Sequence, residues 1–181
     1  RYPTMIHEQN VIPGKANKIL AKCVKRVAVA FKQSMPVFGA KSIWTGCPCN
    51  NQALTTSTKD IRTRLGLKTD SKVVVLLGGS QGSKFLNEAF FEAMKTVLKE
   101  GNIEAVHVTG KNECAVYQEK YKAEHLPAVV SSFISPIEDI YAIADVIVSR
   151  SGAATVSELG FDGTPSILVP YPFAHGHQEY N

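Results

Sequence analysis

The chain has 181 residues, 44% of them hydrophobic, and a formal net charge of +4. This composition is that of a globular protein with room for one large domain or parts of two, and it excludes a disordered or fibrous chain. The sequence holds no run of about 18 apolar residues, which excludes a membrane-spanning helix. Because it starts at Arg1 without an initiator methionine and stops at Asn181 where a helix is expected to begin, we expect a fragment of a longer chain.

The first 50 residues have the short alternating segments of a doubly wound parallel sheet. Four consecutive polar residues, from His7 to Asn10, follow the first predicted strand and indicate a cleft. A helix is predicted after Gly14, with Ile19 and Leu20 facing inward. The strands of this part are predicted at residues 3–6, 27–31 and 41–45.

Positive charge is concentrated in this first part of the chain. Residues 1–59 contain nine Lys or Arg against the single acid Glu8, a net charge of +8, whereas residues 60–181 contain eleven against fifteen, a net charge of −4. Basic residues recur at helical spacing between residues 15 and 26, and this face either contacts an anionic membrane or is simply solvated. Nucleic acid is not an expected partner, because no aromatic residues alternate with these charges.

The cysteines give no sign of a metal site. Cys23, Cys47, Cys49 and Cys114 lack the spacing of a zinc ribbon, and Cys47 and Cys49 are too close together for the usual redox pair. We therefore expect free thiols and a reducing compartment.

The second part of the chain reads as strands that alternate with helices. The run Lys72 to Leu77, KVVVLL, has the continuous apolar character of a central parallel strand. Right-handed crossovers place the turns after such strands along one edge of the sheet, where open α/β sheets bind ligands. Further strands are predicted at residues 103–109, 129–134, 144–148 and 166–170, and helices at residues 84–99, 112–122, 136–142 and 153–160.

These segments predict three parts in the chain. Residues 1–50 are assigned to the end of one doubly wound α/β domain, residues 51–70 to a linker with a short helix, and residues 71–181 to a second, nucleotide-binding α/β domain.

A glycine-rich turn, Gly78 to Ser83, connects the strand KVVVLL to the next helix. Small residues at this position let backbone amides approach a phosphate, and the helix dipole favours its negative charge. The turn has neither the GxGxxG of dinucleotide enzymes nor the GK[ST] of a P-loop, so hydride transfer and nucleotide hydrolysis are weak alternatives. A purely structural tight turn is the other alternative.

A second such turn, Ser149 to Gly152, precedes the helix predicted to start at Ala153. The free N–H groups of that helix are expected to face an anion. Glu158 lies about two turns along it and could accept hydrogen bonds from neighbouring hydroxyls of a sugar. Together with a backbone contact to a base at Ile134, these turns predict a nucleotide site.

Four motifs, HEQNVIPG, GGSQGS, SRSGAATVSE and HQEYN, resemble in this order and spacing the MurG family of bacterial glycosyltransferases, over essentially the whole chain. The resemblance implies an α/β fold of the GT-B type, with two Rossmann-like doubly wound parallel sheets of which the first is incomplete. It also implies inverting transfer of N-acetylglucosamine from UDP-N-acetylglucosamine to an undecaprenyl-diphosphate lipid acceptor bearing muramoyl-pentapeptide, in peptidoglycan synthesis. The implied location is the cytoplasmic face of the bacterial membrane, as a peripheral protein.

The resemblance also implies roles for individual residues. Asn10 is expected to contact the donor sugar, Gln178 the sugar hydroxyls, Ser80 the diphosphate, and the backbone of Ile134 the uracil. Asn10 as a turn former and Gln178 as a helix cap are the structural alternatives. The phosphate and the ribose are expected on six consecutive residues: Ala153, Ala154, Thr155, Val156, Ser157 and Glu158.

Two features set the chain apart from the family pattern. Where the family usually has an arginine at the domain junction, the chain has Asn50, which removes a charge-assisted contact. The family's N-terminal glycine-rich loop, with the histidine proposed as catalytic base, would precede residue 1, which leaves His7 and Glu8 as fallback candidates. Since no DxD motif occurs, no metal or other cofactor is expected, and helix N-termini are expected to stabilise the diphosphate instead.

Two other functions fit the same motifs. One is a non-catalytic nucleotide-sugar-binding subunit that depends on a separate chain for its acceptor site. The other is a different GT-B lipid glycosyltransferase. A sugar-nucleotide epimerase is less favoured, because HEQN and HQEYN favour transfer.

Overall fold

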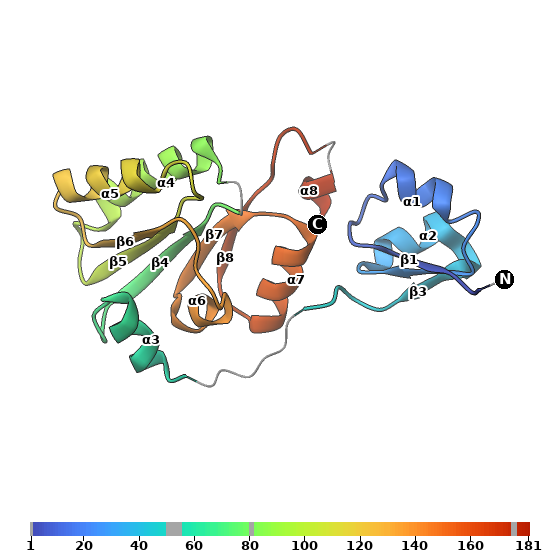
Figure 1. The fold of residues 1–181 in the computed structure, drawn as a ribbon, viewed down its shortest axis with the longest axis horizontal. Helices are drawn as coiled ribbons and strands as arrows, with labels where there is room; N and C mark the ends of the chain where they lie inside the picture. The colour runs from blue at the N-terminus through green and yellow to red at the C-terminus, as the bar shows by residue number, and fades with distance from the viewer. Residues whose placement is uncertain (1, 50–55, 80–81, 175–176) are drawn as a thin grey trace. The chain divides into compact units, whose positions relative to one another are not determined.

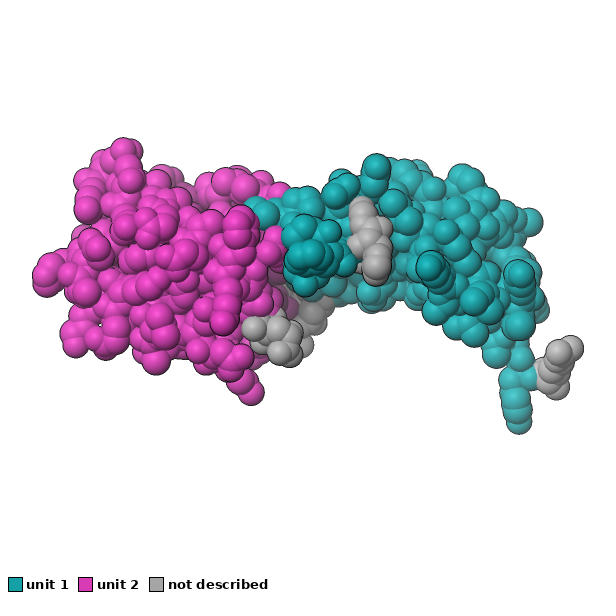
Figure 2. Space-filling view, turned by 90° about the horizontal axis from the view of Figure 1, so that it is seen from above, with its two compact units in different colours: residues 1–50, 151–161, 169–181 teal, residues 51–150, 162–168 magenta. Residues whose placement is uncertain are grey.

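The structure is a computed structural model and describes residues 2–49, 56–79, 82–174 and 177–181. The fold is α/β with two separate sheets of parallel strands (Figure 1), as the sequence predicts. The chain divides into two compact units (Figure 2). Unit 1 contains residues 1–50, 151–161 and 169–181, and unit 2 contains residues 51–150 and 162–168.

The boundary predicted near residue 50 lies outside the described residues and stays a prediction. No helix in the described part of the chain is long and apolar enough to cross a membrane.

Unit 1 contains a small sheet in the strand order β1-β2-β3. Both neighbouring pairs are parallel, with Ile6 opposite Val27 and Ala28 opposite Ile43. Val27 and Val29 are fully buried, and they pack with Val24 and Phe38 in a local core. The elements are β1 (Met5–Glu8), α1 (Lys15–Leu20), β2 (Arg26–Val29), η1 (Lys32–Ser34), α2 (Met35–Phe38), η2 (Gly39–Lys41) and β3 (Ser42–Trp44).

The prediction that Ile19 and Leu20 face inward is wrong. Their exposed fractions are 66% and 47%, and α1 has no buried residue. The side chain that ties this helix to the sheet is Asn17, whose Nδ2 donates to the carbonyl of His7 at 3.2 Å and to the carboxylate of Glu8 at 2.9 Å. In a helix this short, two polar contacts to β1 decide which face meets the sheet, and the apolar residues are left outside.

The second sheet has the strand order β6-β5-β4-β7-β8. The strand KVVVLL forms β4 with the predicted bounds, between β5 and β7, and both of these pairs are parallel. This central position explains its continuous apolar character, because both faces of the strand are covered. The strands are β4 (Lys72–Leu77), β5 (Ile103–Val108), β6 (Ala128–Ser131), β7 (Val146–Arg150) and β8 (Ser166–Val169).

Helices cover the second sheet, with α4 and α5 on one face and α3 and α6 on the other (Figure 1). The alternation of strands and helices from β4 to β8 agrees with the sequence prediction. Gly66 ends α3 in the left-handed region at φ 73°, where glycine has no steric cost. The helices are α3 (Thr58–Leu65), α4 (Lys84–Val97), α5 (Cys114–Ala123), α6 (Glu138–Ile143), α7 (Ala153–Asp162) and α8 (His177–Tyr180).

Several strand boundaries differ from the prediction, and three of the differences affect the site. β7 runs from Val146 to Arg150 rather than over residues 144–148, so Ser149 and Arg150 belong to the strand and not to the turn predicted from Ser149 to Gly152. β1 extends to Glu8 rather than ending at Ile6, so His7 and Glu8 belong to the strand. β6 ends at Ser131 rather than Ile134. The hydroxyl of Ser131 accepts from the N–H of Phe133 and donates to its carbonyl, so the chain turns immediately after the strand.

Candidate functional site

The glycine-rich turn lies at the carboxyl end of β4, the central strand of its sheet. Gly79 and Gly82 have φ values of 78° and 73°. A Cβ on Gly78 would come within 2.8 Å of the Val108 carbonyl, and one on Gly82 would collide with the Thr109 carbonyl. Glycine is therefore required at Gly82 both by its backbone conformation and by the close approach to the end of β5.

The turn passes directly into α4. Ser83 is the N-cap of this helix, and its Oγ accepts from the N–H of Leu86 at 3.4 Å. The first turn of an α-helix has N–H groups without an intrahelical partner and a positive dipole end, which suit an anion. Ser80, predicted to contact the diphosphate, lies outside the described residues.

Arg150 reaches the same turn from the end of β7. Its Nη2 donates to Oγ of Ser83 at 2.8 Å, so the guanidinium is held beside the start of α4. The positive charge adds to that of the helix dipole. The sequence gives no indication of this contact, because 67 residues separate Arg150 from Ser83.

Ile134 lies in the connection that follows β6 and is half-buried. β4 to β7 are parallel, so the connections after β4, β6 and β7 leave the sheet at the same edge. Unit 2 thus brings the glycine turn, Ile134 and Arg150 to the carboxyl edge of one sheet, as the sequence predicts.

The helix α7 begins at Ala153, as predicted, and contains six of the candidate residues. Ala153 is buried, Ala154 is exposed and the four that follow, through Glu158, are half-buried. Within this stretch the hydroxyl of Ser157 donates to the carbonyl of Ala153 at 2.8 Å, which commits that hydroxyl to its own helix.

The charge of the Glu158 carboxylate affects the pKa of Cys49, which lies just before the predicted domain boundary. Burial, the neighbouring Cys47 and the charge of Glu158 together raise the pKa of the Cys49 thiol. All the cysteines are free, as expected. Asn50, the residue that replaces the family arginine, lies outside the described residues.

Asn181 connects three of the four motifs within unit 1. Its Nδ2 donates to Oδ1 of Asn10 at 3.1 Å and to the carbonyl of Ser151 at 3.2 Å, while its Oδ1 accepts from the N–H of Val11 at 3.1 Å. The hydroxyl of Ser151 donates to the carbonyl of Gln178 at 2.6 Å. Asn10 and Gln178, both candidates for contacts with the donor sugar, therefore belong to one hydrogen-bonded network.

The side-chain oxygen of Gln178 accepts from the N–H of Tyr171 at 2.8 Å, and so fixes the segment that follows β8. The amide nitrogen is the other hydrogen-bonding end of this side chain. The sequence suggested Asn10 and Gln178 but gave no indication of the central place of Asn181, which is 171 residues from Asn10.

His7 and Glu8, the fallback candidates for a catalytic base, have structural contacts. Nε2 of His7 lies 3.0 Å from the carbonyl of Gly46, which requires the hydrogen on Nε2. Glu8 is 2% exposed and accepts four hydrogen bonds from Asn10, Gly14 and Asn17. Burial alone would raise the pKa of Glu8, but these hydrogen bonds outweigh it and hold the pKa below its ordinary value. Such a carboxylate is a weak base, so the geometry favours a structural role for Glu8.

The described residues contain no group of three or more His, Cys, Asp or Glu side chains arranged to hold a metal ion. Within unit 2, the backbone amides at the α4 N-terminus and the guanidinium of Arg150 suit a phosphate. Within unit 1, the carboxylate of Glu158 and the side-chain amides of Asn10 and Gln178 suit a hydroxyl-rich ligand.

Residues 73–181 match the family model of the glycosyltransferase family 28 C-terminal domain. The chain belongs to glycosyltransferase family 28. The match begins at the second residue of β4 and runs to Asn181, so it includes the glycine turn, Ile134, α7 and Gln178. The family 28 model therefore covers the predicted second domain, residues 71–181, except for its first two residues.

Relatives extend the similarity over the whole chain. The UDP-N-acetylglucosamine--N-acetylmuramyl-(pentapeptide) pyrophosphoryl-undecaprenol N-acetylglucosamine transferase of Thermoanaerobacter sp. (strain X514) is 38% identical over 186 residues, which cover 99% of this chain and 50% of that protein. The protein of the same name from Desulfotalea psychrophila is 39% identical over 185 residues, which cover 100% of this chain and 49% of that protein. The family 28 chain thus spans about half the length of the relatives it matches.

Solved structures agree. The crystal structure of Acinetobacter baumannii MurG has a TM-score of 0.74 and 27% identity, and the match covers 98% of this chain and 49% of that one. The glycotransferase of kitacinnamycin has a TM-score of 0.60 at 18% identity, with 87% of this chain and 39% of that one covered, and shows the shared fold alone. The resemblance to the MurG family and the GT-B fold, both predicted from the four motifs, are confirmed.

Proposed function

We propose that this chain is the donor-binding part of a glycosyltransferase that moves N-acetylglucosamine from UDP-N-acetylglucosamine to an undecaprenyl-diphosphate acceptor bearing N-acetylmuramoyl-pentapeptide. The names of the relatives support this reaction. The observation that carries the donor assignment is the glycine turn at the carboxyl edge of the unit 2 sheet, with the α4 N-terminus and Arg150 beside it.

Inverting transfer needs a base for the acceptor hydroxyl and stabilisation of the departing UDP. In the proposed mechanism, this chain supplies the second requirement. Amides at the start of α4 and the guanidinium of Arg150 stabilise the negative charge that grows on the diphosphate as the bond to the sugar breaks. No metal is needed for this step, because aligned N–H groups and a fixed cation already provide positive potential.

The remaining contacts follow the family motifs. The backbone of Ile134 binds the uracil, the carboxylate of Glu158 accepts from the ribose hydroxyls, and Asn10 and Gln178 contact the sugar. The network through Asn181 supports the last two roles, since it gives both segments defined positions in unit 1.

Calorimetric titration of the chain with UDP-N-acetylglucosamine tests this assignment. We expect binding, weaker binding of UDP-glucose, which lacks the acetamido group, and none of NADH. Equal affinity for the two sugar nucleotides would favour a different GT-B lipid glycosyltransferase. Absence of binding to all three ligands would contradict the donor assignment.

Replacing Glu158 with alanine should weaken the binding of UDP-N-acetylglucosamine by about 1.5 to 3 kcal/mol, because it removes a charged acceptor for the ribose hydroxyls. Glu158→Gln should fall between alanine and wild type, since it keeps one acceptor oxygen without the charge. Glu119→Ala, which removes an exposed glutamate from α5, serves as the control. Unchanged affinity in both Glu158 variants, measured by calorimetry, would remove the ribose role.

We also propose that the protein is peripheral at the cytoplasmic face of the membrane and that the α1 region contacts anionic lipid. Lys15, Lys18, Lys22 and Lys25 are all exposed. The exposed Ile19 and Leu20 of α1 lie among these lysines, two of which are on the helix and two after it, and a short segment that combines apolar and basic residues in this way is typical of an interfacial segment.

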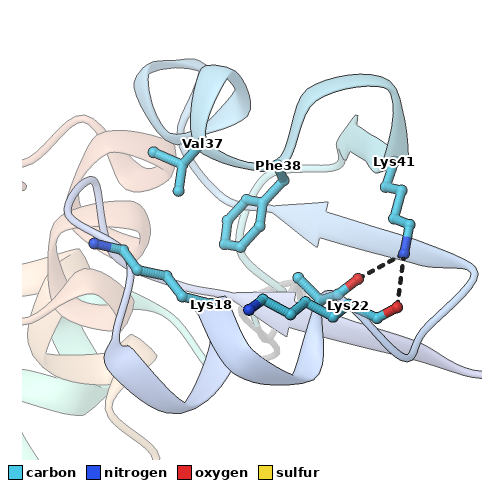
Figure 3. Close-up of a pocket in the computed structure, with 6 residues that line it drawn as sticks. Lys18, Lys22, Val37, Phe38 and Lys41 are labelled. Carbon is cyan, nitrogen blue, oxygen red and sulfur yellow. Dashed lines mark hydrogen bonds between the residues drawn. The ribbon is translucent and has the colours of Figure 1, made fainter.

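A pocket of about 470 Å³ beside α1 supports the lipid contact. Figure 3 shows Val37 and Phe38 of α2 facing Lys18 of α1 and Lys22, which lies two residues beyond the end of that helix. Nζ of Lys41 lies near the same end. That Nζ donates to the carbonyl of Ala21 at 2.7 Å and to that of Lys22 at 3.2 Å. The pocket therefore combines an apolar wall with ammonium groups, which suits a lipid phosphate and the start of its acyl chain.

Changing four lysines of the α1 region to glutamine should lower the affinity for vesicles with anionic headgroups by at least about tenfold, because each lysine near the surface contributes about 1 kcal/mol. Cosedimentation at two salt concentrations measures it. A matched variant with four exposed lysines of unit 2 changed should bind as the wild type does. Equal loss in the two variants would show only a dependence on net charge. The α1 set is Lys15, Lys18, Lys22 and Lys25, and the control set is Lys59, Lys68, Lys99 and Lys122.

A further inference from the structure

Asn87 lies one turn into α4, is fully buried, and makes three side-chain hydrogen bonds. Its Nδ2 donates to the carbonyl of Thr109 at 3.0 Å and to Oε2 of Glu113 at 2.6 Å. Its Oδ1 lies 3.2 Å from Nε2 of His107. One amide therefore joins the first turns of α4 to the end of β5 and to the connection that follows it.

The direction of every bond in this network is determined. Oδ1 of Asn87 can only accept, so Nε2 of His107 carries the hydrogen. Burial lowers the pKa of His107 to about 3, so the ring is neutral and Nδ1 has a free lone pair. The hydroxyl of Tyr121, 3.2 Å away, donates to it. The amide of Asn87 cannot be reversed without placing its oxygen against the Thr109 carbonyl and the Glu113 carboxylate.

The glycine turn packs on the same groups. The N–H of Gly78 donates to the Val108 carbonyl at 3.0 Å, and a Cβ on Gly78 would lie 3.3 Å from Oδ1 of Asn87. Gly82 lies against the Thr109 carbonyl, the acceptor that Asn87 also binds. The glycine turn thus packs on the end of β5, and Asn87 fixes the position of that strand end relative to α4.

The N-terminus of α4 is held from two sides. The N–H of Asn87 donates to the carbonyl of Ser83 at 2.8 Å within the helix, and Arg150 donates to the Ser83 hydroxyl. Asn87 provides the link to β5, and Arg150 provides the link to β7. An anion site made of backbone amides depends on such links, because a displacement of about 1 Å changes every N–H contact at once.

We propose that Asn87 is a positioning residue for the diphosphate of the donor: it holds the glycine turn and the first turn of α4 on the end of β5, so that their amides converge on the phosphates. The inference rests on the proposed function. Asn87 itself is buried behind the turn and is assigned no contact with the ligand.

Separate titrations with UDP and uridine test this role. The ratio of the two dissociation constants, uridine over UDP, isolates the contribution of the diphosphate. Asn87→Asp keeps the shape but places a carboxylate against the Thr109 carbonyl and Glu113. Asn87→Ser removes the same contacts without adding charge. We expect each variant to lower the ratio by about tenfold or more while the affinity for uridine changes by less than about twofold.

A double variant provides the rescue. In N87D/E113Q, the carboxylate introduced at position 87 can accept from the new glutamine amide and still accept from His107, so the link between positions 87 and 113 returns with donor and acceptor exchanged. We expect the ratio to recover part of the loss seen in N87D, because the clash with position 113 is removed while the carboxylate still faces the Thr109 carbonyl. Glu92→Gln, which breaks only the exposed pair with Lys95 on the same helix, should leave the ratio unchanged.

The outcomes separate the possibilities. If the Asn87 variants weaken uridine and UDP by the same factor, Asn87 acts on stability alone and the positioning role is wrong. A wild-type ratio in Asn87→Ser, or in whichever single variant folds, would overturn it as well. If the wild type itself binds UDP no better than uridine, the diphosphate site fails, and the proposed donor function fails with it.

Discussion

Replacing Glu8 with alanine is expected to lower the free energy of unfolding by about 4 kcal/mol. The carboxylate accepts two hydrogen bonds from Asn10 at 2.9 and 3.4 Å, one from the N–H of Gly14 at 3.0 Å and one from Nδ2 of Asn17 at 2.9 Å. Glu8 is 2% exposed, so alanine would leave the donors of Asn10, Gly14 and Asn17 without their carboxylate partner.

The damage should extend to the whole connection between β1 and α1. Glu8 accepts from Asn10 at the start of this loop, from Gly14 at its end, and from Asn17 in the helix that follows. The bond from Asn17 to Glu8 is also one of the two contacts that attach α1 to the strand. Without Glu8, Asn10 is released from one side of its network, and its bond to Asn181 becomes its remaining described side-chain contact.

Denaturant unfolding followed by fluorescence measures the change, since Trp44 is the sole tryptophan and lies on β3 of the same sheet. Glu8→Gln should lose about half as much, because one oxygen remains to accept while the new amide meets N–H donors. Gln9→Ala, next to it and exposed, is the control. A loss below about 1 kcal/mol in Glu8→Ala would show that water replaces the carboxylate at little cost.

The regular part of the fold could be predicted because its signals are local. KVVVLL indicates a central strand by composition alone, and Gly66 marks the end of α3 through a backbone conformation that few other residues adopt. The order of strands and helices after residue 71 follows from the same short-range patterns. The orientation of α1 could not be predicted in this way, because it depends on the contact of Asn17 with Glu8 on another element and not on the spacing of the apolar residues Ile19 and Leu20.

The candidate site could be predicted in its chemistry but not in its connections. The motifs placed the glycine turn, Ile134, α7 and Gln178 after predicted strands. In parallel sheets such positions lie at the carboxyl ends of the strands, so the sequence could predict them. The contacts between Arg150 and Ser83, and between Asn10 and Asn181, join residues far apart in the chain, where no periodic pattern exists. They depend on how the strands are ordered in the sheet and on how the loops fold over its edge.

Lowering the pH from 7.5 to 5 is expected to reduce the free energy of unfolding through His107 by about 2 kcal/mol, and by about 4 kcal/mol at pH 3.5. Burial lowers the pKa of His107 from an ordinary value of 6.5 to about 3. Between these values the unfolded chain binds a proton that the folded chain does not. The contribution of His107 to the free energy of unfolding is therefore fully present above pH 6.5 and is lost progressively as the pH falls toward 3.

The folded protein resists this proton for a structural reason. His107 is fully buried among the rings of Phe90, Tyr117 and Tyr121, and its Nδ1 must stay unprotonated to accept from the Tyr121 hydroxyl. A charged ring would lose that bond and gain no carboxylate partner, since Glu113 is occupied by Asn87. Protonation of His107 would therefore disturb contacts near the carboxyl end of β5, where the glycine turn packs.

Comparison with His107→Gln isolates this effect, because glutamine cannot titrate and the carboxyl groups of the chain titrate in both proteins. Unfolding by denaturant at pH 7.5, 6 and 5, followed by near-ultraviolet circular dichroism of the tyrosines in unit 2, gives the slope of unfolding free energy against pH for the wild type and for the variant. The wild type should lose about 2 kcal/mol more than the variant over this range. Parallel slopes would mean that His107 is protonated in the folded protein, and the directed network from Tyr121 to Asn87 would then be incorrect.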